Sequence, residues 1–264
     1  MRRPEELLER CLVDSPEDID QEVLAHEAGL KVVDKPLTGC EASLVGIGDK
    51  GIVTVTTGVA PVRRRFSIAH EIGHWEQHRG QSFSCRIEER ALDKAARSKE
   101  READDYAASL MMPTNLFKEG IASRKAGVSL ALVSELATIF NASFPAAAIR
   151  YVELSGEPVV LVFNGAGNGR WWHSRSKRVP EHLYLQREID PDSFASDLVH
   201  AASPAKKFGK MPAEAWFASI KEDRFELHEH SIRFPEGIYT ILHLTDDELI
   251  EERMSAKRSW RDRE

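Results

Sequence analysis

The sequence lacks the features of a secreted or membrane protein. It has no run of about 18 apolar residues, the length that a membrane-spanning helix needs. Its first segment, MRRPEELLERCL, alternates charged and apolar side chains and has neither a signal-peptide core nor a cleavage site. Only three cysteines are present, and no two of them form a CxxC pair. We therefore expect a cytoplasmic protein with no disulfide framework and no membrane partner.

An excess of positive charge is also missing. The chain has 36 Lys and Arg residues against 43 Asp and Glu residues, a formal net charge of -7. This balance argues against a broad nucleic-acid-binding surface, although it leaves room for a local basic groove. With 264 residues, 42% of them hydrophobic, the chain can form one large domain or two to three smaller ones.

Local signals predict a mixed α+β fold. In the first half the expected helices and strands are helix 18–28, strands 30–33, 42–47 and 51–56, and helices 61–79 and 91–112. The turn Gly48-Asp49-Lys50 predicts a hairpin between two of these strands. A helix–turn–helix-like pair follows, and after Gly156 the chain turns to strands. These elements are expected at 129–140, 143–153, 159–163, 170–173, 224–230 and 238–244.

The helix expected over 61–79 contains the pattern HExxH, His70-Glu71-Ile72-Gly73-His74. Residues four apart lie one above the other on a helix, so His70 and His74 can present their imidazoles to one cation. Glu71 can then act as the general base for a water molecule on the open side of that cation. Zinc fits this donor set, because it accepts two neutral imidazoles and a carboxylate and keeps a fourth position for water.

The residues around the motif are consistent with this interpretation. Ile68, Ile72 and Trp75 lie on one side of the helical wheel, which predicts an apolar face in the core and histidines that face a cleft. Gly73 weakens the helix, which predicts the close approach of a neighbouring strand.

The third metal ligand is not fixed by the pattern. His78 lies two turns beyond His70, too far along a straight helix to share its cation, so we expect it to be a polar residue at the helix end. A carboxylate on the next helix remains, and the candidates are Glu88, Glu89, Asp93, Glu100, Glu102 and Asp104.

Two blocks of the sequence resemble the ImmA/IrrE family of metallopeptidases. The first is RFSIAHEIGHW at 65–75, and the second contains EADDYA from residue 102 and ends with LMMP at 110–113. The resemblance implies that His70, His74 and Glu102 bind Zn²⁺ and that Glu71 is the base. It also implies cleavage of a helix–turn–helix transcriptional repressor, which relieves repression in a stress or phage-defence response.

The resemblance and the local signals together predict three parts. These are a zincin-like metallopeptidase domain over 1–122, a helix–turn–helix-like segment over 123–156 and a C-terminal α/β sensor domain over 157–264, which the resemblance describes as GAF-like. The helical pair is barely basic, so packing or substrate docking is favoured over DNA reading.

Two residues near the site have alternative interpretations. Cys85 lies between the two helices that carry the ligands, where a thiolate could take the open zinc position and hold the enzyme inactive. The alternative is an idle free cysteine. Tyr106 is one turn from Glu102, and it is either a substrate or transition-state helper or a packing residue.

The C-terminal part contains one candidate for signal recognition. Trp171 and Trp172, with Arg170 and Arg175, have the composition to stack single-stranded DNA as an activating ligand. Adjacent strand residues point to opposite faces, however, so one of the two tryptophans is expected in the core.

Two functions of other classes stay open at this point. The first is a non-catalytic, zinc-stabilised regulator that binds and sequesters a repressor. The second is a zinc hydrolase that acts on small amides.

Overall fold

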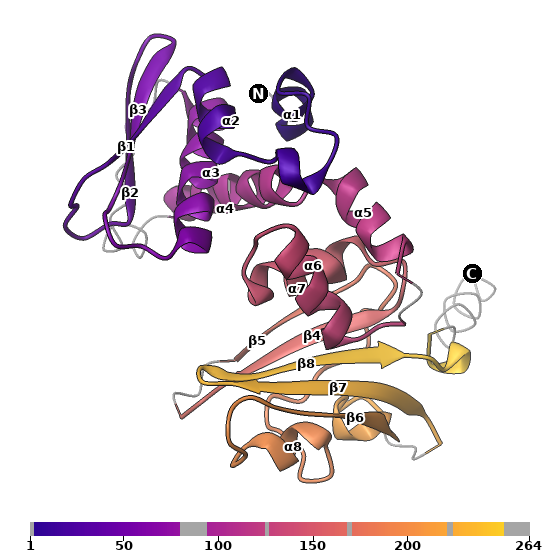
Figure 1. Ribbon diagram of the computed structural model, residues 1–264. Helices are drawn as coiled ribbons and strands as arrows, with labels where there is room; N and C mark the ends of the chain where they lie inside the picture. Colours follow the sequence, from indigo (N-terminus) through magenta and orange to yellow (C-terminus); the bar gives the residue numbers. More distant parts are fainter. Residues whose placement is uncertain (1–2, 80–93, 125–126, 168–170, 221–223, 251–264) are drawn as a thin grey trace, which may run out of the picture. The chain divides into compact units, whose positions relative to one another are not determined.

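The computed structural model describes residues 3–79, 94–124, 127–167, 171–220 and 224–250. It forms two compact units, one of residues 1–123 with 135–147 and the other of residues 124–134 with 148–264. Helices occur in both units and each unit contains one sheet, so the predicted α+β class is confirmed (Figure 1). Cys85 and Arg170 lie outside the described residues.

The first unit contains a three-stranded sheet of β1 (Leu30–Asp34), β2 (Ala42–Ile47) and β3 (Lys50–Val55). The strand order is β1-β3-β2, in which β1 runs parallel to β3 and β2 runs antiparallel to it. Ile47 pairs with Lys50, and Gly48 between them has a φ of 63°, a conformation that glycine adopts without steric cost. The predicted hairpin is therefore confirmed.

Five α-helices lie among the described residues before residue 123, and α2 and α3 pack on this sheet. The helix α2 begins after Asp20, whose carboxylate accepts hydrogen bonds from two backbone amides of the first turn, and Gly29 with a φ of 87° follows its end. The short helices α1 and α5 were not expected from the sequence. The bounds are α1 Pro4–Arg10, α2 Gln21–Glu27, α3 Pro61–His78, α4 Lys94–Met111 and α5 Thr114–Ala122.

The helix α3 is held between the sheet and α4. On the sheet side, the Trp75 ring lies over Gly46, where a Cβ atom would overlap it, and Trp75 Nε1 donates a 2.8 Å hydrogen bond to the carbonyl of Ala28. On the other side, a Cβ atom at Gly73 would lie 2.9 Å from the backbone oxygen of Ala103 in α4. The predicted close approach at Gly73 is therefore made by a helix and not by a strand.

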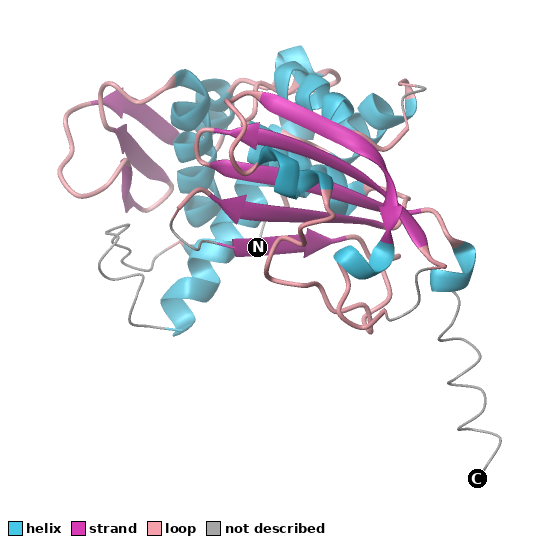
Figure 2. Cartoon of the chain, turned by 90° about the horizontal axis from the view of Figure 1, so that it is seen from below, coloured by secondary structure: helices cyan, strands magenta, loops and turns pink. Residues whose placement is uncertain are grey.

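The second unit contains an antiparallel sheet (Figure 2), whose five strands lie in the order β5-β4-β8-β7-β6. One face carries an apolar core that includes Val160, Val162, Leu227 and Leu242. The edge strand β6 and the short helix α8 were not expected from the sequence. The bounds are β4 Val159–Gly165, β5 Trp171–Arg175, α8 Phe194–Leu198, β6 Ala205–Pro212, β7 Glu226–Phe234 and β8 Gly237–Leu244.

The expected helical pair forms as α6 (Leu130–Ile139) and α7 (Phe144–Leu154), joined through Asn141 with a φ of 46°. Residues of this pair contribute to both compact units.

Among the described residues, no single helix has the length and apolar character to cross a membrane. Only α6 and α7 taken together have this length and apolar character, and the two helices are bent by 110° relative to each other.

A buried carboxylate organises the second unit. Glu229 in β7 is fully buried, and its oxygens accept hydrogen bonds from two backbone amides at the start of α8 and from the Trp216 indole and the Ser231 hydroxyl. These donors fix α8 and the segment around Trp216 on the sheet. Burial is the largest influence on this group, and it raises the pKa of Glu229 above its ordinary value despite the four donors.

The raised pKa of Glu229 predicts a pH dependence of stability. The folded unit holds this proton more tightly than the unfolded chain does, so the stabilising contribution is complete below the ordinary pKa of about 4.3 and is lost as the pH rises through the folded value. We expect the unfolding free energy of the wild type, taken relative to that of Glu229→Gln, to fall from pH 4.5 towards pH 7. Hydrogen exchange in β7 at increasing urea concentration measures the unfolding free energy of both proteins. A relative stability of the wild type that stays constant or rises with pH contradicts the raised pKa of Glu229.

Candidate metal centre

The helix α3 places the HExxH motif in the interior of the first unit. Pro61 occupies its first turn, where the missing backbone N–H costs nothing, and the segment 67–76 is buried on every side. Ile68, Ile72 and Trp75 form the expected apolar face. His70 and His74 are also buried, at 6% and 1% exposure, because α4 packs closely along Gly73.

Two imidazoles and one carboxylate converge beside this helix. His70 Nε2 lies 3.0 Å from His74 Nε2, and the Glu100 carboxylate of α4 faces both nitrogens, with Oε2 3.4 Å from His70 Nε2 and Oε1 3.4 Å from His74 Nε2. A tetrahedral zinc ion with bonds of about 2.0–2.1 Å separates its ligand atoms by about 3.3 Å. The two nitrogen–oxygen distances are close to that value, and the nitrogen–nitrogen distance is about 0.3 Å shorter. The three side chains therefore have the donor chemistry and the separation of a metal site.

A carboxylate fixes the tautomer of His70. The Nδ1 atom of His70 lies 2.9 Å from an oxygen of Asp104, and an ionised carboxylate only accepts hydrogen bonds. We therefore assign the proton to Nδ1, which leaves a lone pair on Nε2. That lone pair points to the place where Glu100 and His74 converge, as a histidine ligand requires.

The structure brings a different carboxylate to the two histidines from the one that the resemblance implied. Glu100, and not Glu102, faces the two histidines. The Glu102 side chain is 41% exposed, and its oxygens accept hydrogen bonds from His78 Nε2 and the Ser98 hydroxyl, each at 3.1 Å. Residues two apart on a helix are about 200° apart around its axis, so the two carboxylates reach different parts of α3, Glu100 the histidines of the motif and Glu102 the helix end at His78. The bond from His78 holds the pKa of Glu102 below its ordinary value.

The other residues singled out from the sequence lie as follows. Glu71 is 1% exposed and directly follows His70. Tyr106 is 2% exposed and lies in the contact between α3 and α4, with its Cβ atom 3.2 Å from the position that a Gly73 Cβ would take. Burial raises the pKa of the Tyr106 phenol, so it is neutral. This position is typical of a packing residue, and a helper role stays a prediction.

The two tryptophans of β5 point to opposite faces of the second sheet, as alternation predicts. Trp171 packs against the apolar core, while Trp172 stacks on Phe163 with ring centroids 5.5 Å apart. Arg175 donates a hydrogen bond to the carbonyl of Leu183. These residues have structural partners, and binding of single-stranded DNA by them stays a prediction.

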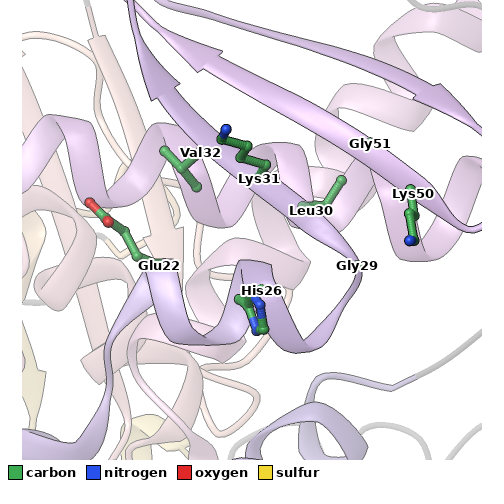
Figure 3. Close-up of a pocket in the computed structure, with 8 residues that line it drawn as sticks. All are labelled: Glu22, His26, Gly29, Leu30, Lys31, Val32, Lys50 and Gly51. Atoms are coloured by element: carbon green, nitrogen blue, oxygen red, sulfur yellow. The ribbon is translucent and has the colours of Figure 1, made fainter.

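A separate pocket of about 600 Å³ lies between α2 and the β1 edge of the first sheet (Figure 3). Its lining has both charge signs, negative at Glu22 and positive at Lys31 and Lys50. Glu22 is already engaged, because Arg64 approaches its carboxylate to 2.8 Å. None of the metal-site residues lines this pocket. The complete lining is Glu22, His26, Gly29, Leu30, Lys31, Val32, Lys50 and Gly51.

The HExxH motif lies within a segment of the chain that is similar to a known protein family. Residues 21–151 match the family model described as the IrrE N-terminal-like domain. Among solved structures, the chain is similar to a Mycobacterium tuberculosis transcriptional regulator, with a TM-score of 0.58 and 15% sequence identity over 93% of this chain and 87% of that chain. That likeness shows a shared fold. No curated protein sequence is significantly similar to this chain.

Proposed function

The chain belongs to the ImmA/IrrE family of metallopeptidases and regulators, and from this premise we propose that it is a zinc-dependent endopeptidase. The observation that carries the proposal is the convergence of His70, His74 and Glu100 on one point. Two neutral imidazoles and one carboxylate are a common ligand set of catalytic zinc sites, which leave the fourth position to water. The HExxH sequence places Glu71 next to these ligands.

Each residue of the site has a distinct role in this proposal. His70, His74 and Glu100 hold Zn²⁺, which when bound supplies a Lewis acid and a water molecule of lowered pKa. Asp104 keeps the lone pair of His70 on Nε2 by accepting the proton of Nδ1. The Glu71 carboxylate takes the proton of the attacking water and passes it to the nitrogen of the leaving amine.

We infer that the substrate is a helix–turn–helix transcriptional repressor, whose cleavage relieves repression in a stress or phage-defence response. The family resemblance supports this substrate. The similar solved chain, which is described as a transcriptional regulator, is consistent with a role in transcription regulation. On this account the protein acts in the cytoplasm, and residues 157–264 sense the activating signal, for which single-stranded DNA is one candidate. Cys85 acts as a removable fourth ligand of the zinc ion and holds the enzyme inactive while it is bound.

Metal removal tests the proposal against its non-catalytic alternative. The wild type, incubated with a repressor encoded beside its own gene, is expected to produce two discrete fragments. Dialysis against a strong chelator should abolish this cleavage, and one equivalent of zinc should restore it. A zinc-loaded protein that binds the repressor without producing fragments would instead support sequestration. Hydrolysis of a small amide substrate in the presence of intact repressor separates the peptidase from a small-amide hydrolase. Inhibition by the repressor is expected of the peptidase, and no inhibition would support the small-amide hydrolase.

A further inference from the structure

His78 connects Glu102 to the metal site, although neither residue lies at the point where the ligands converge. His78 is the last residue of α3, and its side chain is 4% exposed. Its Nε2 atom lies 3.1 Å from a Glu102 oxygen, and its Nδ1 atom lies 3.2 Å from His74 Nδ1. The other nitrogen of His74 is the one that faces His70 and Glu100. Glu102, His78 and His74 therefore form a continuous row of polar contacts.

The contacts of this row suit one arrangement of protons. A carboxylate accepts hydrogen bonds, so the contact with Glu102 requires a proton on His78 Nε2. Metal binding through His74 Nε2 places the His74 proton on Nδ1, and His78 Nδ1, 3.2 Å away, is positioned to accept it. His74 is left with its lone pair on Nε2, the atom that converges with His70 and Glu100. The other tautomer of His74 would turn an N–H towards the ligand site and leave no lone pair there for a metal.

We propose that His78 and Glu102 are positioning residues that fix the ring orientation and the tautomer of His74 for metal binding. The inference rests on the proposed metal site. It gives the two histidine ligands different supports, a direct carboxylate for His70 and a carboxylate acting through a second imidazole for His74. Ser98 holds the other oxygen of Glu102 and so limits the rotation of that carboxylate.

Substitutions at His78 test the row through its donor and acceptor atoms. His78→Leu removes both atoms, whereas His78→Gln keeps one acceptor for His74 and one donor for Glu102. Loss of an outer-shell partner typically lowers metal affinity by about 10–100-fold. We expect a weakening of that size for zinc in the Leu variant and near-wild-type binding in the Gln variant. Competition with a chromophoric chelator measures the affinity on the full-length chain.

A spectroscopic signature separates positioning from a loss of packing. With Co²⁺ in place of zinc, the visible absorption reports the ligand geometry, and we expect it to change in His78→Leu and to recover in His78→Gln. Because His78 is buried, thermal unfolding of the metal-free variants provides the folding control. If His78→Leu does not fold, Glu102→Leu, at a more exposed position, tests the positioning role instead. We expect it to weaken zinc binding and to change the Co²⁺ spectrum in the same direction.

The outcomes distinguish this inference from the proposed function. Wild-type zinc affinity and a wild-type Co²⁺ spectrum in a folded His78→Leu or Glu102→Leu variant would overturn the positioning role alone. A wild-type protein that binds neither zinc nor Co²⁺ would overturn the metal site itself, and the inference with it. Weaker binding in the Leu variants with rescue by His78→Gln supports both.

Discussion

Glu71→Gln is expected to slow repressor cleavage by about 10²–10⁴-fold, the contribution typical of a general base, while the protein keeps its zinc. The amide has nearly the shape of the carboxylate but does not take a proton from water. Glu71 is 1% exposed, so an isosteric replacement also avoids a cavity. The measurement is the single-turnover rate of fragment formation, with zinc content determined on the same sample.

The same variant separates catalysis from sequestration. If the protein acts by binding alone, Glu71→Gln should relieve repression as well as the wild type does. A reporter gene under the repressor gives this comparison, and a pull-down of the intact repressor confirms that the variant still binds it. Undiminished cleavage by a zinc-loaded Glu71→Gln protein would refute the assigned base.

The second large effect is expected at Glu100. Glu100→Gln replaces a charged ligand by a neutral amide and should cost most of the zinc affinity, because the carboxylate is the anionic member of the ligand set. Glu102→Gln is the matched comparison, two residues away on the same helix. Its amide oxygen can still accept from His78, so we expect it to retain zinc with at most about a tenfold weaker affinity.

Isothermal titration of both metal-free variants with zinc makes this comparison. The result also decides between the ligand that the sequence resemblance implies and the one that the structure places at the site. Loss of zinc in Glu102→Gln together with retention in Glu100→Gln would contradict the structural assignment. Thermal unfolding of the metal-free proteins checks that neither substitution acts through folding.

The local signals of α3 were sufficient to predict it. Pro61 at its start, the apolar face of Ile68 and Ile72 and the HExxH spacing are local features, and the structure contains the helix over Pro61–His78. The hairpin at Gly48 was predictable for the same reason. By contrast, β6 contains three lysines and a glycine, and it is a strand because its backbone pairs with β7 along its whole length. That pairing is tertiary and leaves no local signal.

The choice between Glu100 and Glu102 shows where sequence reasoning stopped. Both residues lie at edges of the apolar stripe of α4, so periodicity did not separate them. What separates them is the rotation of α4 against α3, which Gly73 sets by letting the Ala103 backbone approach closely. Gly73 itself was recognised as a point of close approach, but the residue gives no indication of whether a strand or a helix approaches it. His78 was expected to be a polar helix end, and its contact with His74 depends on the same packing.

X-ray absorption at the zinc edge of the purified full-length protein tests the central claim most directly. We predict one zinc ion per chain with a first shell of two imidazole nitrogens and oxygen donors at about 2.0–2.2 Å, and loss of this shell in Glu100→Gln. A sulfur scatterer at about 2.3 Å that disappears in Cys85→Ala would identify Cys85 as the fourth ligand of the inhibited form that the proposal includes. A protein that takes up no zinc, or a shell without two imidazoles, would contradict the account.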